Sequence, residues 1–194
     1  MKYVENSLLE AQIAINNFCS NNAEIIKIYK SIDLMVECIK NGGHIFSCGN
    51  GGSMTDAMHF AEELSGRYRL NRPALPGIAI SDSSHVSCVA NDFGYNQVFS
   101  RFIEANVHSN DIVLAISTSG KSENVISALK VCKERQIKSI LLTGQPNSPC
   151  ENLATISIVA TGGIFADRVQ ELHIKIIHIL IEGIERNLFP NNYK

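Results

Sequence analysis

The stretch HIFSCGNGGS, residues 44–53, joins an apolar run to a glycine-rich loop, and a helical pattern follows it to about Ser65. The apolar run is typical of a buried strand, and glycines let the chain turn tightly into a helix. The same order of strand, polar loop and helix returns at residues 111–136. Repeated alternation of strand and helix predicts a parallel sheet covered by helices on both faces.

Outward from this stretch, apolar runs and helical patterns indicate the remaining elements. Further strands are expected at 77–80, 139–143 and 154–160, and further helices through Val86, at 99–105 and at 166–188. Apolar residues at helical spacing predict two leading helices, which Asn41-Gly42-Gly43 ends. The predicted fold class is α/β, a flavodoxin-like three-layer αβα domain with a parallel sheet flanked by helices. One domain spans 1–194, with leading helices in 1–41 and the αβα core in 42–194.

Composition limits the classes of function. A chain of 194 residues and 21.3 kDa with a net charge of −2 has no basic surplus for nucleic-acid binding. The apolar-rich run 174–184 is interrupted by charged residues, so no membrane span is expected, and residues 1–6 do not resemble a signal peptide. The six cysteines occur singly, which favours free buried thiols. We therefore expect a cytoplasmic protein with no nucleic-acid or membrane partner.

The glycine loop 48–53 is the first candidate for binding a phosphate. Its glycines allow close approach of a ligand to the main chain, and the following helix offers free N–H groups and the positive end of its dipole. No Walker motif follows the loop. A structural turn would also favour glycine, so the loop alone leaves both interpretations open.

The second candidate is Ser117-Thr118-Ser119-Gly120-Lys121-Ser122, which again lies between a strand and a helix. Four hydroxyl groups at the start of a helix can surround a phosphate with donors. The alternative is a capping box that uses Glu123, but such a cap needs only one hydroxyl. Both loops follow strands, and ligands of parallel sheets bind at the carboxyl ends of strands. Together the loops predict a phosphorylated ligand.

Several longer stretches carry a resemblance to a known family. They are 49–53, 56–64, Arg67 with Arg72-Pro73, 91–95, 117–120 with Ser122, and 166–171 leading to His178. On these residues the sequence closely resembles the sugar isomerase (SIS) domain family over nearly its whole length, as a single SIS domain. Within that family it is similar to the bacterial phosphoheptose isomerases, also called sedoheptulose 7-phosphate isomerases.

The resemblance implies an intramolecular aldose–ketose isomerase that converts D-sedoheptulose 7-phosphate into D-glycero-D-manno-heptose 7-phosphate through an enediol. This reaction is the first step of ADP-heptose and lipopolysaccharide core heptose biosynthesis. The resemblance also implies a homotetramer with sites between subunits and one Zn²⁺ in each site.

Site residues follow from the matched positions. The resemblance implies that the zinc ligands are His59, Glu63, Gln170 and His178. It implies Glu63 as base and His178 as acid in catalysis. The implied substrate-binding residues are Asn50, Gly51, Gly52, Ser53, Glu63, Arg67, Asn91, Asp92, Ser117, Thr118, Ser119, Ser122, Asp167 and Gln170.

The spacing of the implied ligands agrees with a shared ion. His59 and Glu63 lie on one face of a helix at i, i+4. The Cα atoms of Gln170 and His178 are expected ~12 Å apart on one helix, which two side chains can bridge. A lone histidine is more often a surface residue or a satisfied core residue, and we interpret the remaining four in that way: His44, His85, His108 and His173.

The sequence departs from the family at two places. Close relatives often carry His-Cys where Met54-Thr55 stand, and the segment 161–165 lies where relatives vary widely. Neither departure removes an implied ligand.

Three alternatives stay open at this point. A non-enzymatic SIS adaptor of the DnaA-binding type would keep the fold, but Glu63 and His178 favour an enzyme. A sensor module of a transcription regulator would need a DNA-binding segment, and the first forty residues carry no basic recognition helix. An isomerase for another ketose phosphate belongs to the same class.

Overall fold

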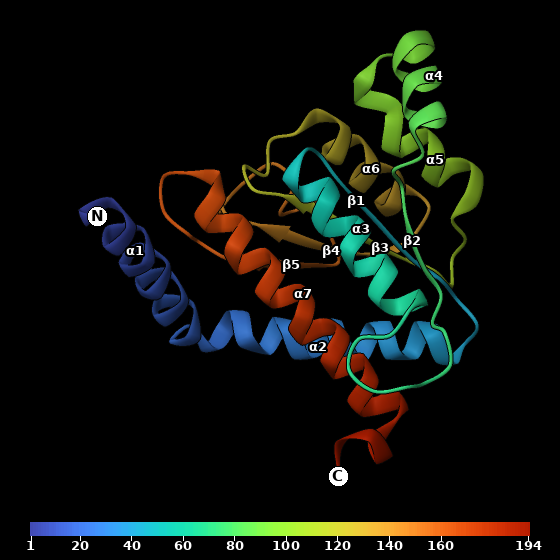
Figure 1. Ribbon diagram of the computed structural model, residues 1–194. Helices are drawn as coiled ribbons and strands as arrows, with labels where there is room; N and C mark the ends of the chain where they lie inside the picture. Colours follow the sequence, from blue (N-terminus) through green and yellow to red (C-terminus); the bar gives the residue numbers. More distant parts are fainter.

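Five parallel strands form one sheet in the order β2-β1-β3-β4-β5. The computed structural model describes residues 1–194 (Figure 1). Its strands are β1 (Ile45–Gly49), β2 (Gly77–Ala79), β3 (Ile112–Ser117), β4 (Lys138–Thr143) and β5 (Ile156–Val159). Its α-helices are α1 (Lys2–Cys19), α2 (Asn22–Lys40), α3 (Gly52–Ser65), α4 (Ser83–Phe93), α5 (Val98–Asn106), α6 (Glu123–Glu134) and α7 (Ala166–Leu188). The expected elements are confirmed, with boundaries that shift by a few residues.

The sheet divides the interior into two apolar clusters. One cluster joins α2, α3 and α7 to the strand side chains that include Ile45, Leu114 and Ile140. The other joins α5 and α6 to the alternate strand residues, such as Phe46 and Val113. Successive residues of a strand point to opposite faces, so a central strand buried on both sides is apolar throughout. The predicted three-layer αβα fold is confirmed.

The leading helices continue the layer that contains α7. α2 packs on α7 and β5, while α1 projects from the body and contacts α7 and, to a lesser extent, α2 (Figure 1). The side chain of Asn21 caps α2 at the main-chain N–H of Glu24, and Gly42, at φ 76°, follows the end of α2 as the sequence predicted.

The strand order places a crevice between β1 and β3. In a 2-1-3-4-5 sheet the connections leave these two strands in opposite directions, and ligands bind at their carboxyl ends. Gly49, the last residue of β1, pairs with Ile116 near the end of β3. The glycine loop and the Ser/Thr loop therefore lie side by side.

The expectation that the six cysteines are free buried thiols was wrong for two of them. Cys38, Cys48, Cys132 and Cys150 are buried free thiols, but Cys19 and Cys88 are exposed on helix surfaces. Among the helices, none is long and apolar enough to span a bilayer.

Candidate active site

Helices α3 and α7 lie side by side and supply the centre of the candidate site (Figure 1). Near their starts, Gly52 of α3 touches the side chain of Gln170 of α7. Two turns further along both helices, His59 faces His178. The parallel course of the two helices thus brings together residues more than a hundred positions apart in sequence.

Three of the four implied ligands converge at this second contact. His59 Nε2 lies 3.1 Å from His178 Nε2 and 3.6 Å from Glu63 Oε1. Tyr68 packs beside the ring of His178, with 5.8 Å between the ring centroids. His59, Glu63 and His178 are all half-buried, so the cluster lies at the surface of the chain and is covered only on its inner side.

Burial and neighbouring charges shift the pKa values of Glu63 and His178 in directions that favour acid–base chemistry. Burial, followed by the negative charge of Glu62, raises the pKa of Glu63, although His59 opposes the shift. Burial, followed by the positive charge of His59 and then of Lys175 and Arg69, lowers the pKa of His178. A carboxylate of raised pKa is a better base, and an imidazole of lowered pKa stays neutral near pH 7.

Two acidic residues of α3 join the cluster, and the sequence analysis did not assign them a role. Glu62 Oε1 lies 3.5 Å from His59 Nδ1, on the side of the ring away from His178. Asp56, one turn before His59, has a buried Oδ2 with no hydrogen-bond partner, and burial raises the pKa of Asp56 to about 6. The i, i+3 spacing of both residues to His59 is the signal that could have identified them.

The donor set is compatible with a zinc ion. Two ligand atoms bound at ~2.0–2.1 Å to one tetrahedral Zn²⁺ stand ~3.3 Å apart. The two separations from His59 Nε2, 3.1 Å to His178 Nε2 and 3.6 Å to Glu63 Oε1, bracket that value, and His59, Glu62 and Glu63 offer ligand atoms within 4.8 Å of one another. Glu62 can hold the Nδ1–H of His59, which leaves Nε2 free as a ligand, as in many histidine metal sites. The residues present therefore fit the implied metal.

Gln170 occupies a different place from the other implied ligands. Its amide packs over Gly52, where an added Cβ would stand 2.4 Å from Nε2. Along α3 this position is ~10 Å from His59 at the usual helical rise. The structure thus brings Gln170 to the glycine-loop end of α3 and leaves it apart from the His59 cluster.

The glycine loop is held by a polar network at the end of β1. Asn50 and Asn124 exchange two side-chain hydrogen bonds of 2.8 Å, and the hydroxyl of Tyr95 donates to Asn50 Oδ1 at 3.0 Å. Gly51, at φ 54°, is in the left-handed region that glycine adopts without strain. Ser53 is buried just inside α3. The network fixes the loop against the start of α6.

Three hydroxyls of the Ser/Thr loop make contacts within it, and Ser117 Oγ lies 3.2 Å from Ser122 Oγ. Ser117 Oγ accepts from the Gly120 N–H at 3.1 Å, and Ser119 Oγ accepts from the Lys121 N–H at 3.2 Å. Ser122 is the N-cap residue of α6, yet its side chain makes no capping hydrogen bond. Because no hydroxyl acts as the cap, the capping-box alternative is not supported. Thr118 and Ser119 are accessible at the rim.

The remaining implied substrate residues lie at the surface, and Arg67 stands beyond the end of α3 that is opposite the glycine loop. Asn91 and Asp92 stand at the end of α4, hydrogen-bonded to each other at 2.7 Å. Arg67 is exposed after α3 and forms no ion pair, while Asp167 is exposed in the first turn of α7.

The interpretation of His173 as a satisfied core residue was wrong in one respect. His173 is fully buried on α7, but neither ring nitrogen has a hydrogen-bond partner. Burial lowers the pKa of His173 to about 4, and the main chain of Thr143 acts in the opposite direction. The other three behave as expected: His85 bonds the carbonyl of Val98, and His44 and His108 flank Asp111.

Comparison with known proteins identifies the class. The model of the SIS domain family matches residues 13–144. The chain therefore belongs to the SIS domain family, as its sheet order and strand-end loops indicate.

Within this family, the chain groups with the phosphoheptose isomerases. It is 50% identical to the phosphoheptose isomerase of Escherichia fergusonii over 185 residues, covering 95% of this chain and 96% of that protein. Among solved structures, phosphoheptose isomerase GmhA from Neisseria gonorrhoeae has a TM-score of 0.87 and 31% identity, covering 95% of this chain and 97% of that one. A phosphoheptose isomerase from Francisella tularensis has the same TM-score and coverage at 30% identity.

Proposed function

We propose that the chain is a phosphoheptose isomerase, which converts D-sedoheptulose 7-phosphate into D-glycero-D-manno-heptose 7-phosphate. The observation that carries the proposal is the convergence of His59, Glu63 and His178 beside a phosphate-type crevice. Relatives with 50% identity over 95% of the chain have this activity by name. The enzyme would thereby begin the synthesis of the ADP-heptose used in lipopolysaccharide cores.

The sugar phosphate would bind across the carboxyl ends of β1 and β3. Main-chain N–H groups at the starts of α3 and α6 and the hydroxyls of Thr118 and Ser119 would hold the phosphate. The reacting end of the sugar would then extend along α3 toward Glu63. Residue 63 lies ~16 Å along the helix from residue 52, a length that the extended sugar phosphate and the side chain of Glu63 would span together.

Isomerisation moves one proton between C1 and C2 of the open-chain sugar. Glu63 would take the proton from C1 and return it to C2, and the raised pKa of its carboxyl group favours this role. His178 would pass a proton between the two sugar oxygens. Zinc, when bound, would polarise those oxygens and orient them toward His178.

The proposal assigns the zinc to His59, Glu63 and His178, with Gln170 as the fourth ligand. Imidazole and carboxylate donors suit zinc. A shift of the Gln170 side chain away from Gly52 would be needed for it to reach the ion. Loading the protein with Zn²⁺ and counting ions per chain, with Gln170→Ala beside wild type, tests this assignment independently of turnover.

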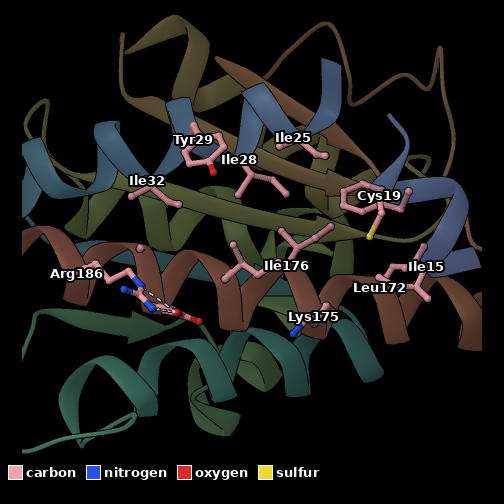
Figure 2. Close-up of a pocket in the computed structure, with 14 residues that line it drawn as sticks. Ile15, Cys19, Ile25, Ile28, Tyr29, Ile32, Leu172, Lys175, Ile176 and Arg186 are labelled. Atoms are coloured by element: carbon pink, nitrogen blue, oxygen red, sulfur yellow. Dashed lines mark hydrogen bonds and ion pairs between the residues drawn. The ribbon is translucent and has the colours of Figure 1, made fainter. Parts of the chain in front are cut away.

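A homotetramer with sites between subunits belongs to the same proposal. An apolar hollow of about 460 Å³ opens between α1, α2 and α7, and Figure 2 shows side chains such as Ile25, Ile28 and Ile176 around it. This hollow is remote from the strand-end loops, so it suits subunit packing better than the substrate.

We place the enzyme in the cytoplasm, where free thiols stay reduced.

The test is incubation of zinc-loaded protein with sedoheptulose 7-phosphate, with heptose 7-phosphate measured as product. Turnover at a rate well above that with other ketose phosphates supports the proposal. Binding of the sugar phosphate without turnover would contradict it and point to the DnaA-binding adaptor. That alternative is not favoured, because Glu63 and His178 are both present and converge on His59.

A further inference from the structure

Arg72, in the connection between α3 and β2, is buried against the last turn of α3. Its side chain is 1% exposed. It donates to the main-chain carbonyls of Glu63 at 2.6 Å, Leu64 at 2.7 Å, Gly66 at 3.1 Å and Pro73 at 3.2 Å. The last carbonyls of a helix have no partner within it, so Arg72 supplies their donors. Its positive charge also suits the negative end of the helix dipole.

The shortest of these bonds holds the residue that carries the proposed base. The main-chain carbonyl of Glu63 is fixed by Arg72, while the Glu63 carboxyl group extends to within 3.6 Å of His59 Nε2. A glutamate side chain has three free torsions, so the position of its main chain limits where the carboxyl group can lie. Arg72 therefore restrains Glu63 without touching the reacting groups.

The same guanidinium also fixes α7. Arg72 Nε donates to Glu185 Oε1 at 2.8 Å, and Glu185 is fully buried. Glu185 lies two helical turns after His178 on α7. One buried ion pair thus joins the end of α3, which bears Glu63, to the helix that bears His178. Buried charges of this kind are stable only as a pair with all their hydrogen bonds made.

Tyr193, in the short 3₁₀ turn Pro190–Tyr193, completes the hydrogen bonding of the pair. Its hydroxyl donates to Glu185 Oε2 at 2.6 Å. The guanidinium of Arg186 covers its ring at 4.4 Å, and the side chain of Asn192 donates to the carbonyl of Asn71 at 3.1 Å. Burial and the bond to Glu185 raise the pKa of Tyr193, which keeps the hydroxyl protonated as a donor.

We propose that Arg72, Glu185 and Tyr193 form a clamp of positioning residues that sets the place of Glu63 relative to His178 for the isomerisation. This role rests on the proposed function. The clamp acts at the end of α3 opposite the phosphate loops, so it affects proton transfer and leaves phosphate binding unchanged. Tyr193 is its outermost member and Arg72 its centre.

Tyr193→Phe removes only the hydroxyl that bonds Glu185. We expect kcat to fall about tenfold with KM unchanged, because a misplacement of ~1 Å can cost about a hundredfold and one of several contacts is lost. Tyr3→Phe, at an exposed tyrosine of α1, is the matched control and should keep the wild-type kcat. A wild-type kcat in Tyr193→Phe would overturn the proposal, as would a rise in KM without a fall in kcat.

Arg72→Lys gives a second measurement that keeps the positive charge. Lysine is a point charge and cannot hold several carbonyls and a carboxylate in a fixed fork, so kcat should fall further than in Tyr193→Phe. Circular dichroism and thermal melting establish that both variants are folded. If folded Arg72→Lys retains the wild-type kcat, the clamp has no positioning role.

Amide hydrogen exchange separates this inference from the proposed function. In Tyr193→Phe, exchange should rise for the last turn of α3, residues 61–66, and stay unchanged in the Ser/Thr loop 117–122. Unchanged exchange at 61–66 would overturn the clamp even if the wild type is an active isomerase. Raised exchange at 61–66 with an inactive wild type would support the clamp and count against the proposed function alone.

Discussion

His173 shows how a single residue can couple stability to pH. It is fully buried with both ring nitrogens unbonded, and burial lowers its pKa to about 4. In the unfolded chain the same imidazole binds a proton at an ordinary pKa of about 6.5. Below that pH the unfolded state binds more protons than the folded state, so the free energy of unfolding falls as pH falls.

We therefore predict a loss of stability of about 3 kcal/mol from this residue between pH 6.5 and pH 4, since each pKa unit corresponds to about 1.4 kcal/mol. Urea denaturation at a series of pH values measures it. His173→Leu should flatten the dependence, and His108→Gln, at an exposed histidine, should retain it. An equally steep dependence in His173→Leu would contradict the assigned cause.

Sequence reasoning at the residue scale succeeded where spacing within one helix was enough. The i, i+4 pair His59 and Glu63 was predicted to share a face, and the structure confirms it. The burial of Arg72 against Glu185 could not be predicted, because the two residues are joined only by the packing of α7 on α3. The only feature of the sequence that pointed to Arg72 was its place in a stretch that resembles the SIS domain family.

At the scale of elements, the two strand-end loops were predicted well. A strand, a polar loop and a helix follow one another within a few residues, so local propensity determines them. The order of the strands was expected only as a class, because sheet order depends on which long-range pairs form. The Asn50–Asn124 pair, which fixes one loop to the helix after the other, depends on that order.

The Ser/Thr loop gives a prediction about binding. Ser119→Ala removes an accessible hydroxyl from the rim, and we expect KM for sedoheptulose 7-phosphate to rise about tenfold. One hydrogen bond to a charged group contributes about 1.5 kcal/mol. The value of kcat should change little, because the loop lies at the far end of α3 from Glu63.

Steady-state kinetics measures both quantities. Ser127→Ala, on the following helix α6, is the matched control. A fall in kcat with KM unchanged in Ser119→Ala would show that the loop does not act through phosphate binding.

The whole molecule exposes an apolar surface that one chain does not cover. On α1, at least half of the surface of each of Leu8, Leu9 and Ile13 is exposed to solvent. Ile26 and Tyr29 of α2 are exposed as well. Projecting helices with such residues are typical of an assembly interface. The helical patterns of the leading segments could not show that α1 stands away from the sheet, because that position depends on long-range packing.

We predict that Leu9→Asp weakens the assembly. A charge in an apolar interface is costly, so the variant should have a smaller mass in solution than wild type and lower activity. Light scattering measures the mass, for which a tetramer of 21.3 kDa chains is the expectation in the wild type. Lys30→Asp, at an exposed polar position of α2, controls for the added negative charge. A monomeric wild type that is fully active would contradict the proposed shared sites.

The most direct test of the account compares Glu63→Gln with Glu62→Gln in zinc-loaded protein supplied with sedoheptulose 7-phosphate. Both variants exchange one carboxylate for an amide on the same turn of α3, and only Glu63 is proposed to move the proton. We predict that Glu63→Gln lowers kcat by about a hundredfold to ten-thousandfold, as expected for loss of a general base. Glu62→Gln should lose much less, because its amide oxygen can still accept the Nδ1–H of His59. Equal rates in Glu63→Gln and wild type would contradict the central claim.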